Sequence, residues 1–261
     1  PARDGCGSVN IGIECHYAIA SRLTPTFGSA QGLSSCTDRL CCPITVLIET
    51  LPMSAPSMTL FHNTLSPFVR KVMVLLHETG QQDRVALQDC VLSPVSPSAE
   101  LNADNPLGKI PALRLADGTV IHDSRVILEY LDHQHVGNPL IPREGSARWR
   151  RLTLASMADG IMDASVMVRY ELVLRAPEKH WDEWLEAQRE KIRRALNLLE
   201  NDAIAELTSH FDIAAISVAC ALGYLDLRFP DLGWREANPQ LASWFFEVSQ
   251  RPSMIATIPK T

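Results

Sequence analysis

The stretch NPLGKIPALRLADGTVIHDSRVILEYLD, residues 105–132, decides the fold, because it carries a strand, a hairpin and a helix start in succession. The Pro-Leu-Gly sequence at 106–108 ends any preceding helix, and the apolar run 110–115 predicts a strand. Asp117 and Gly118 are typical of a two-residue hairpin turn, so residues 119–122 are expected to return as an antiparallel strand. Asp123 or Ser124 then caps a helix whose apolar residues recur at helical spacing, namely Val126, Ile127, Tyr130 and Leu131.

Pro111 opens the first of these strands, where a missing backbone donor is tolerated. These residues alone favour an ordinary trans proline at a strand edge, because cis bonds are rare. The alternative is a cis Ile110–Pro111 bond, whose kink would leave the Ile110 amide and carbonyl free for an extended, peptide-like ligand. At the following helix, Ser124 and the first free amides predict a carboxylate site, since a helix N-terminus carries about half a positive charge.

The composition is that of a globular protein with a sizeable core, since 46% of the 261 residues are apolar. The formal net charge of -6 argues against a nucleic-acid partner, which needs a basic surface to meet phosphates. No apolar run approaches the roughly 18 residues of a membrane span, so no membrane partner is expected. Most cysteines precede Met58, and Cys90 and Cys220 are typical of small core residues in a reducing compartment. We therefore expect a cytoplasmic main body.

The first 57 residues have no helical or strand period and are rich in Ser, Gly, Pro and Cys, so they are not assigned to the fold. The favoured interpretation is a translated upstream region or a cloning remnant, with the start at Met53 or Met58. A signal peptide with residues 41–48 as its apolar core is the alternative, which a proline in that run and a glutamate after it weaken.

From Met58 onward, the pattern predicts a strand at 59–62, a helix at 66–79 and a second strand at 84–92. Ser66 is the expected N-cap of this helix, with a proline in its first turn. A βαβ unit followed by a hairpin and a helix is the topology of a thioredoxin-like domain, which we place at residues 58–136.

Residues 137–143, GNPLIPR, predict a linker, and the pattern beyond it is helical almost throughout. An all-helical domain is therefore expected at 144–261. Its first helix is predicted at 146–175, where Gly160 marks a bend or close packing. The run 212–225 is apolar nearly all round and suits the buried central helix of a bundle.

No metal site is predicted. His133 and His135 share no helical face and have no companion ligands, and the cysteines at 36, 41 and 42 lack the paired spacing of a zinc site. Asp159 and Asp163, four residues apart, could form a polar pair beside a functional site. A helix cap or a solvated helix face is the favoured interpretation of that pair.

These elements resemble those of the cytosolic glutathione S-transferases, and especially the short bacterial members of the YibF type. The resemblance rests on SPFVRK at 66–71, NPLGKIPAL at 105–113 and ADGIMDA at 158–164. It covers the chain from about Met58 to the C-terminus. It implies an α/β thioredoxin-like domain followed by an all-α helical bundle, with glutathione as co-substrate.

The resemblance also implies which residue activates the glutathione thiol. Ser66 lies where the family carries its serine or cysteine, and a hydroxyl aimed at the sulfur would lower the thiol pKa from its ordinary value of about 8.5. Ser66 is therefore the candidate catalytic residue, with Asn63 and Thr64 as competing donors. A simple helix N-cap is the structural alternative for Ser66. Because the motif is SPF and not CPF, thiol transfer through a protein cysteine is not expected.

By the same resemblance, the Ile110 backbone would pair with the cysteinyl unit of glutathione. Asp123 and Ser124 would hold its γ-glutamyl end, and Lys109 would face its glycyl carboxylate. The electrophile pocket is expected along the first long helix, with Met157, Ile161 and Tyr170 as candidate linings.

The expected function is therefore that of a glutathione S-transferase, which activates the glutathione thiol for attack on a small hydrophobic electrophile in detoxification. Glutathione-dependent peroxidase or isomerase activity is a variant of this hypothesis. The other hypothesis is a non-catalytic module that uses the same fold to bind proteins, as stringent-starvation proteins do. The family also implies a homodimer in which helices corresponding to 124–134 and 146–175 pack across a two-fold axis.

Overall fold

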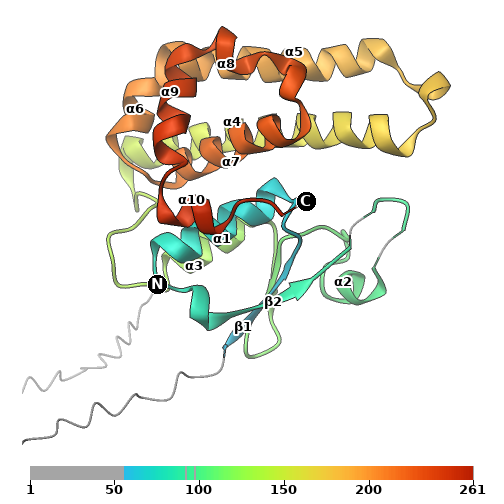
Figure 1. Cartoon of the computed structure of the whole chain (residues 1–261). Helices are drawn as coiled ribbons and strands as arrows, with labels where there is room; N and C mark the ends of the chain where they lie inside the picture. The colour runs from blue at the N-terminus through green and yellow to red at the C-terminus, as the bar shows by residue number, and fades with distance from the viewer. Residues whose placement is uncertain (1–55, 92, 97, 261) are drawn as a thin grey trace, which may run out of the picture. The chain divides into compact units, whose positions relative to one another are not determined.

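The computed structural model describes residues 56–91, 93–96 and 98–260, so the expectations for the first 57 residues lie almost entirely outside the described residues. All described residues belong to one compact unit of the chain. Strands and helices alternate in its first part, and its second part is helical throughout (Figure 1). This is the predicted fold class, a thioredoxin-like α/β part followed by a helical bundle.

Four strands form one mixed sheet in the order β2–β1–β3–β4. The first two are parallel, and the last two form an antiparallel hairpin beside β1, so the predicted βαβ unit and hairpin are confirmed. The first strand, β1 (Met58–His62), begins one residue before the predicted range. The other three are shorter than predicted: β2 (Val85–Asp89), β3 (Ala112–Arg114) and β4 (Val120–Ile121).

The helices of the first part cover the sheet and position its loops. They are α1 (Pro67–Glu78), α2 (Ala99–Asp104) and α3 (Ser124–Asp132), with a short 3-10 turn, η1 (Gln82–Arg84), before β2. The sequence pattern predicted no helix at α2. Its signals are the N-cap Ser98, whose hydroxyl oxygen accepts from the Leu101 amide at 3.3 Å, and the fully buried Leu101 side chain.

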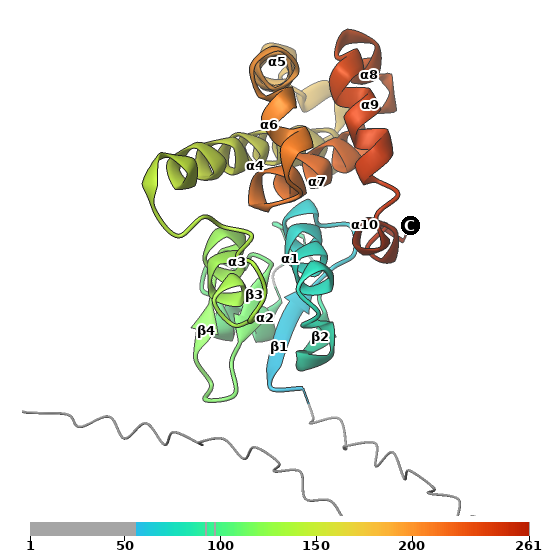
Figure 2. The same ribbon diagram turned by 90° about the vertical axis from the view of Figure 1, so that its left-hand side faces the viewer.

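The second part is a bundle built around α7, which packs against α4 and against α1 of the first part (Figure 2). Apolar residues on every side of α7 are buried, as predicted for the central helix. Asp212 caps α7 by accepting from the Ala214 amide at 3.0 Å, and Arg151 of α4 forms an ion pair with the same carboxylate. The helices are α4 (Gly145–Leu174), α5 (Asp182–Leu198), α6 (Ile204–Ser209), α7 (Ile213–Arg228), α8 (Trp234–Ala237), α9 (Pro239–Val248) and α10 (Pro252–Ala256), with short turns η2 (Pro177–Lys179), η3 (Leu199–Ala203) and η4 (Pro230–Leu232).

The structure bears on two expectations for these helices, the packing at Gly160 and the absence of a membrane span. α4 runs through Gly160, which is exposed and has no atom within 4 Å of the place a Cβ would take, so the close packing expected there is wrong. Within the described ranges, no single helix has the length and apolar character of a membrane span. Only α7 joined to the segment 230–237 meets that test, as a pair bent by 102°.

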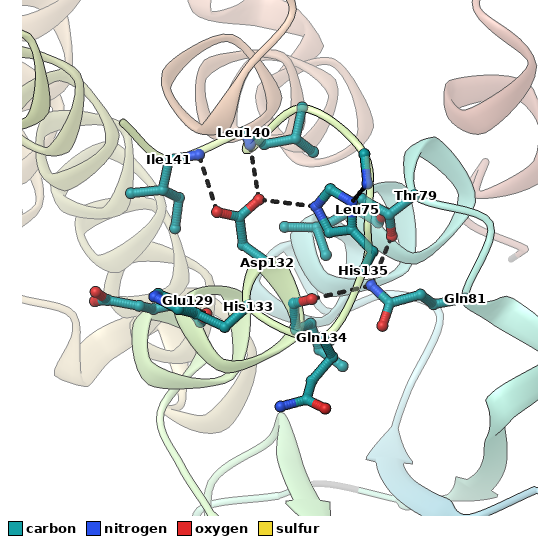
Figure 3. A network of polar contacts seen from close by, with 12 residues as sticks. Leu75, Thr79, Gln81, Glu129, Asp132, His133, Gln134, His135, Leu140 and Ile141 are labelled. Atoms are coloured by element: carbon teal, nitrogen blue, oxygen red, sulfur yellow. Dashed lines mark hydrogen bonds and ion pairs between the residues drawn. The ribbon is translucent and has the colours of Figure 1, made fainter. Parts of the chain in front are cut away.

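The linker between the two parts is held by Asp132, the last residue of α3. Its side chain is fully buried and accepts from the Leu140 amide at 2.7 Å and the Ile141 amide at 3.2 Å (Figure 3). His135 Nε2 lies 3.2 Å from the same carboxylate, and Arg143 Nη1 lies 3.4 Å from it. One buried carboxylate therefore fixes the linker to the end of α3.

Candidate functional site

Three connections of the sheet meet at one of its edges. β1 ends, β3 begins and β4 ends there, as the antiparallel pairs Phe61–Ala112 and Leu113–Ile121 show. The residues that continue from these strand ends therefore lie on the same edge. They include the predicted site residues Ser66, Lys109, Ile110, Asp123 and Ser124.

Ser66 is the N-cap of α1 and is half-buried. Its Oγ accepts from the Val69 amide at 3.3 Å, which leaves the hydroxyl hydrogen available to a ligand. Of the competing donors, Asn63 is engaged within its loop, donating to the Cys90 carbonyl at 3.0 Å and accepting from the Leu65 amide at 3.0 Å. Ser66 therefore combines the two readings of the sequence, a helix cap and a free hydroxyl donor.

The Ile110–Pro111 bond is cis, so the trans interpretation favoured from the residues alone is wrong. The Ile110 side chain is buried in a small core cluster, 7% exposed, beside Phe61 and Ala112. Among the hydrogen bonds of the described residues, none uses the Ile110 amide or carbonyl. Both groups are available for an extended ligand, and the exposed Lys109 precedes them.

Asp123 caps α3, and its carboxylate accepts from the Arg125 amide at 3.0 Å. Ser124 is only 3% exposed. A small buried hydroxyl beside the first amides of a helix is suited to a carboxylate. Ser124 and the start of α3 therefore lie together as the predicted carboxylate site requires, and that site stays a prediction.

A charged cluster lies behind this helix start. Lys71 of α1 and Asp159 of α4 form an ion pair, and the other oxygen of Asp159 accepts from Arg125 Nε at 2.8 Å. Asp159 is 2% exposed, so the interpretation as a solvated face is wrong for this residue. Partial desolvation by the neighbouring residues and the charge of Asp159 raise the pKa of Asp163, and Lys109 is among the cations that oppose this rise. Asp159 thus joins α1 and α3 to the helical part.

A narrow crevice lies beside Ser66. Its other walls include Arg70 of α1, Cys220 and Tyr224 of α7 and Pro259 of the C-terminal tail, and it leaves no room for a water molecule. The tail is tied to the loop by a hydrogen bond from the Thr64 hydroxyl to the Lys260 carbonyl at 3.4 Å. The sequence analysis missed these four wall residues. Of these four residues, only Arg70 could have been predicted from the sequence, because it lies one helical turn after Ser66.

The three residues expected to line an electrophile pocket lie in different surroundings. Ile161 is 1% exposed and belongs to the core of the bundle, so its side chain does not line a pocket, which corrects that expectation. Met157 is partly buried against the same core. Tyr170 is 38% exposed and lies near Tyr224, where its charge affects the pKa of that hydroxyl. None of the three lines the crevice beside Ser66.

A second, larger cavity of about 700 Å³ opens between α3 and α4. Its walls are mostly apolar and include Val126, Tyr130, Leu152 and Ala155, with Lys71 and Asp159 also bordering it. Ser66 and Ile110 do not line it. In the part of the chain that the structure describes, no group of three or more His, Cys, Asp or Glu side chains has the arrangement of a metal site.

A thioredoxin-like sheet with a cis-proline edge, followed by a helical bundle, defines the class of glutathione S-transferase-like proteins. The family model for the glutathione S-transferase N-terminal domain matches residues 65–134, and the model for the C-terminal domain matches residues 182–245. The chain belongs to the glutathione S-transferase family.

Particular relatives agree with this assignment. A glutathione transferase family member from Pseudomonas fluorescens Pf-5, solved with bound glutathione, is 76% identical over 78% of this chain and all of that chain, with a TM-score of 0.78. A further structure from P. fluorescens Pf-5, with bound S-(propanoic acid)-glutathione, is 74% identical over the same shares, with a TM-score of 0.74. The uncharacterized GST-like protein YibF of Escherichia coli K12 is 34% identical over 77% of this chain and 98% of its own length.

Proposed function

We propose that the protein is a glutathione S-transferase that activates the glutathione thiol at Ser66 for attack on a small electrophile. The observation that carries the proposal is the convergence of the Ser66 hydroxyl, the unused Ile110 backbone and the Ser124 helix start at one edge of the sheet. The Pseudomonas structures that contain glutathione or an S-substituted glutathione support the same ligand for this chain.

The proposed binding mode follows from the chemistry of the tripeptide. The peptide-like cysteinyl unit lies along Ile110 and exchanges backbone hydrogen bonds with it. The γ-glutamyl carboxylate lies on Ser124 and the first amides of α3, where the helix dipole favours an anion. Lys109 is exposed at the start of this edge and faces the glycyl carboxylate. The cysteinyl sulfur then points toward the start of α1 and Ser66.

At Ser66 the free hydroxyl hydrogen donates to the glutathione sulfur. A thiol near its ordinary pKa of about 8.5 is mostly protonated at neutral pH, and the thiolate is the nucleophile. The hydroxyl donor and the N-terminus of α1 both favour the thiolate over the thiol, so they lower the thiol pKa. The thiolate then attacks an electrophile bound beside it, where proximity accelerates the reaction.

The test is the conjugation of glutathione to chlorodinitrobenzene, together with the pKa of the bound thiol from its thiolate absorbance. Ser66→Ala is expected to raise that pKa toward about 8.5 and to slow conjugation at neutral pH by about tenfold or more, since a hydrogen bond to a charged group contributes about 1.5–3 kcal/mol. Thr64→Ala is the matched control and keeps the wild-type rate. A full rate in Ser66→Ala would exclude Ser66 as the donor. Glutathione binding without turnover of any electrophile would favour the non-catalytic alternative.

We also propose that the protein is a homodimer in the cytoplasm. The groove between α3 and α4 has apolar walls, and the nearby side chains of Val126 and Trp149 are 52% and 67% exposed, which a second copy would cover. Cys90 and Cys220 are free thiols, which fits a reducing compartment. Light scattering is expected to give a dimer for the wild type and a monomer for Val126→Glu. A monomeric wild type would contradict the dimer.

A further inference from the structure

Arg70 of α1 lies one helical turn after Ser66 and borders the same crevice. It is 9% exposed, and its Nε atom is buried without a hydrogen-bond partner in the described part of the chain. Arg125, Arg151 and Arg251 each form an ion pair, whereas Arg70 forms none among the described residues. Because a guanidinium is always protonated, a full positive charge is buried beside Ser66 without a carboxylate from the described residues to compensate it.

The fold fixes the position of the Arg70 guanidinium. α1 packs against both α7 and α10 (Figure 2). From α10, the Met254 carbonyl accepts from Arg70 Nη2 at 3.2 Å, in a buried hydrogen bond. On α7, a Cβ at Gly223 would lie 2.5 Å from Arg70 Nη1, so the absence of a side chain at Gly223 makes room for the guanidinium. The charge is therefore held in one place relative to the start of α1.

The crevice that Arg70 shares with Ser66 is dry. It leaves no room for a water molecule, and its walls include the apolar residues Leu65, Pro67 and Pro259. A charge acts more strongly through such surroundings than through water, because the effective dielectric constant is about 20 instead of about 80. A fixed positive charge at short range in a protein lowers the pKa of an acid by about 1–3 units.

The buried thiol of Cys220, which lines the crevice from α7, responds to the charge of Arg70. Burial raises the pKa of this thiol to about 11, and the charge of Arg70 opposes that rise more than the charge of Lys71 does. The charge of Asp159 acts in the opposite direction. Arg70 therefore favours a negative charge on a sulfur atom at this crevice.

The other titratable side chains around the crevice do not neutralise Arg70. From α7, Cys220 and Tyr224 are uncharged at neutral pH, because burial raises the pKa of both. Arg228, whose guanidinium carbon is 6.0 Å from the centre of the Tyr224 ring, is a further cation. Lys260 of the C-terminal tail is exposed and is also a cation. None of these groups supplies a negative charge.

The carboxylates of the helices packed around Arg70 have other partners. Asp159 of α4 forms ion pairs with Lys71 and Arg125. Glu78, at the far end of α1, pairs with Arg251. The negative charge of each carboxylate is therefore balanced by its own cation, and the charge of Arg70 remains to act on the start of α1.

We propose that Arg70 is the electrostatic partner of Ser66, and that its buried charge stabilises the negative charge of the glutathione sulfur to which the Ser66 hydroxyl donates. This inference rests on the transferase function proposed above and adds a second residue to the same site. Arg70 acts across the crevice without touching the sulfur, and no proton passes through it. A purely structural role, in which Arg70 only joins α1 to α10 through the Met254 carbonyl, predicts lower stability and an unchanged thiol pKa.

The first test is the pKa of the bound glutathione thiol, measured from thiolate absorbance. Arg70→Gln removes the charge and keeps a donor for the Met254 carbonyl, and it is expected to raise this pKa by about 1 unit. Conjugation to chlorodinitrobenzene then slows about tenfold below the thiol pKa and returns toward the wild-type rate at alkaline pH, where the thiol is ionised in both proteins. Arg70→Lys keeps the charge and is expected to retain most of the wild-type shift.

Arg84→Gln is the matched control for the loss of one positive charge. Arg84 also forms no ion pair among the described residues, but it is exposed and donates to the Gln134 carbonyl at 3.1 Å, away from the crevice. Its substitution is expected to leave the thiol pKa and the pH–rate profile unchanged. Arg70→Met is the second neutral variant, to be used if circular dichroism shows that Arg70→Gln is not folded.

The second test needs no glutathione. Ser66→Cys places a thiol at the half-buried start of α1, and its alkylation by iodoacetamide follows its thiolate fraction. Peptide mass spectrometry separates this thiol from the other cysteines of the chain. Arg70→Gln, added to Ser66→Cys, is expected to raise the pKa of the alkylation by about 1 unit, and Arg84→Gln to leave it unchanged.

The outcomes separate this inference from the proposed function. If Arg70→Gln leaves both thiol pKa values unchanged, or slows conjugation equally at every pH, Arg70 has a structural role and the inference is overturned, while the transferase proposal stands. If the folded wild type binds no glutathione, the transferase proposal falls. The alkylation of Ser66→Cys then still decides whether the Arg70 charge acts on a sulfur at position 66.

Discussion

Lys71 of α1 and Asp159 of α4 form an ion pair whose side chains are 1% and 2% exposed. The second oxygen of Asp159 accepts from Arg125, the residue that follows Ser124 at the start of α3. One buried carboxylate therefore connects the helix of Ser66, the helix of Ser124 and the bundle. The relative position of the two proposed glutathione-binding helices depends on it.

Asp159→Asn is expected to destabilise the protein by about 3–5 kcal/mol, because it leaves the buried Lys71 charge without a partner. Urea denaturation followed by circular dichroism measures the change. Asp231→Asn is the matched control, the same substitution at an exposed position of η4 without an ion pair among the described residues. A loss below about 1 kcal/mol for Asp159→Asn would mean that the ion pair does not hold the helices together.

For Asp163→Asn we predict a gain in stability, the opposite of the loss expected for Asp159→Asn. Partial desolvation and the neighbouring Asp159 charge raise the pKa of Asp163 above the ordinary 3.8. The resulting stabilisation is fully present below the unfolded pKa and is lost as the pH rises through the folded pKa. At neutral pH, Asp163→Asn should therefore unfold at a higher urea concentration than the wild type. This advantage should vanish below about pH 3, where both side chains are neutral. A variant less stable than the wild type at pH 7 would contradict the sign.

Cys220 borders the crevice beside Ser66, yet it is not expected to act as a nucleophile. Complete burial raises the pKa of its thiol to about 11, so only about one thiol in ten thousand is ionised at pH 7. Cys220→Ala should therefore keep the pH–rate profile of glutathione conjugation. A loss of activity together with a shifted profile would assign the thiol a chemical role. A lower stability alone would reflect the small cavity left in the core.

Asp132 provides a test of the linker. Asp132→Ala leaves the Leu140 and Ile141 amides without their acceptor, which is expected to cost at least about 2 kcal/mol of unfolding free energy. Glu144→Ala, at an exposed position at the end of the same linker, is the control and should be neutral within about 0.5 kcal/mol. Equal stability of the two variants would show that the linker does not depend on this carboxylate.

Local patterns predicted most of the fold. The hairpin signal Asp117-Gly118, the N-cap Ser66 and the apolar run of α7 each depend on near neighbours in the sequence, and each prediction is confirmed. Helix α2 was missed because its six residues are too few to show a period.

The features of the site that the sequence did not predict depend on distant contacts. Asp159 looked like a solvated carboxylate, because its partner Lys71 lies 88 residues away. Ile161 looked like a pocket residue, but the packing of α4 on α7 turns it into the core. Arg70 and Tyr224 border the same crevice because α1 packs against α7 in the folded protein. A single sequence carries no signal for such pairs.

The central claim is that the edge formed by Ile110 and the start of α3 binds glutathione. Calorimetric titration with reduced glutathione tests it most directly, with Ser124→Ala and the control Ser98→Ala measured in parallel. We predict saturable binding at one site per chain, weakened about tenfold or more in Ser124→Ala and unchanged in Ser98→Ala. No detectable binding to the folded wild type, or equal affinity in Ser124→Ala, would contradict the account.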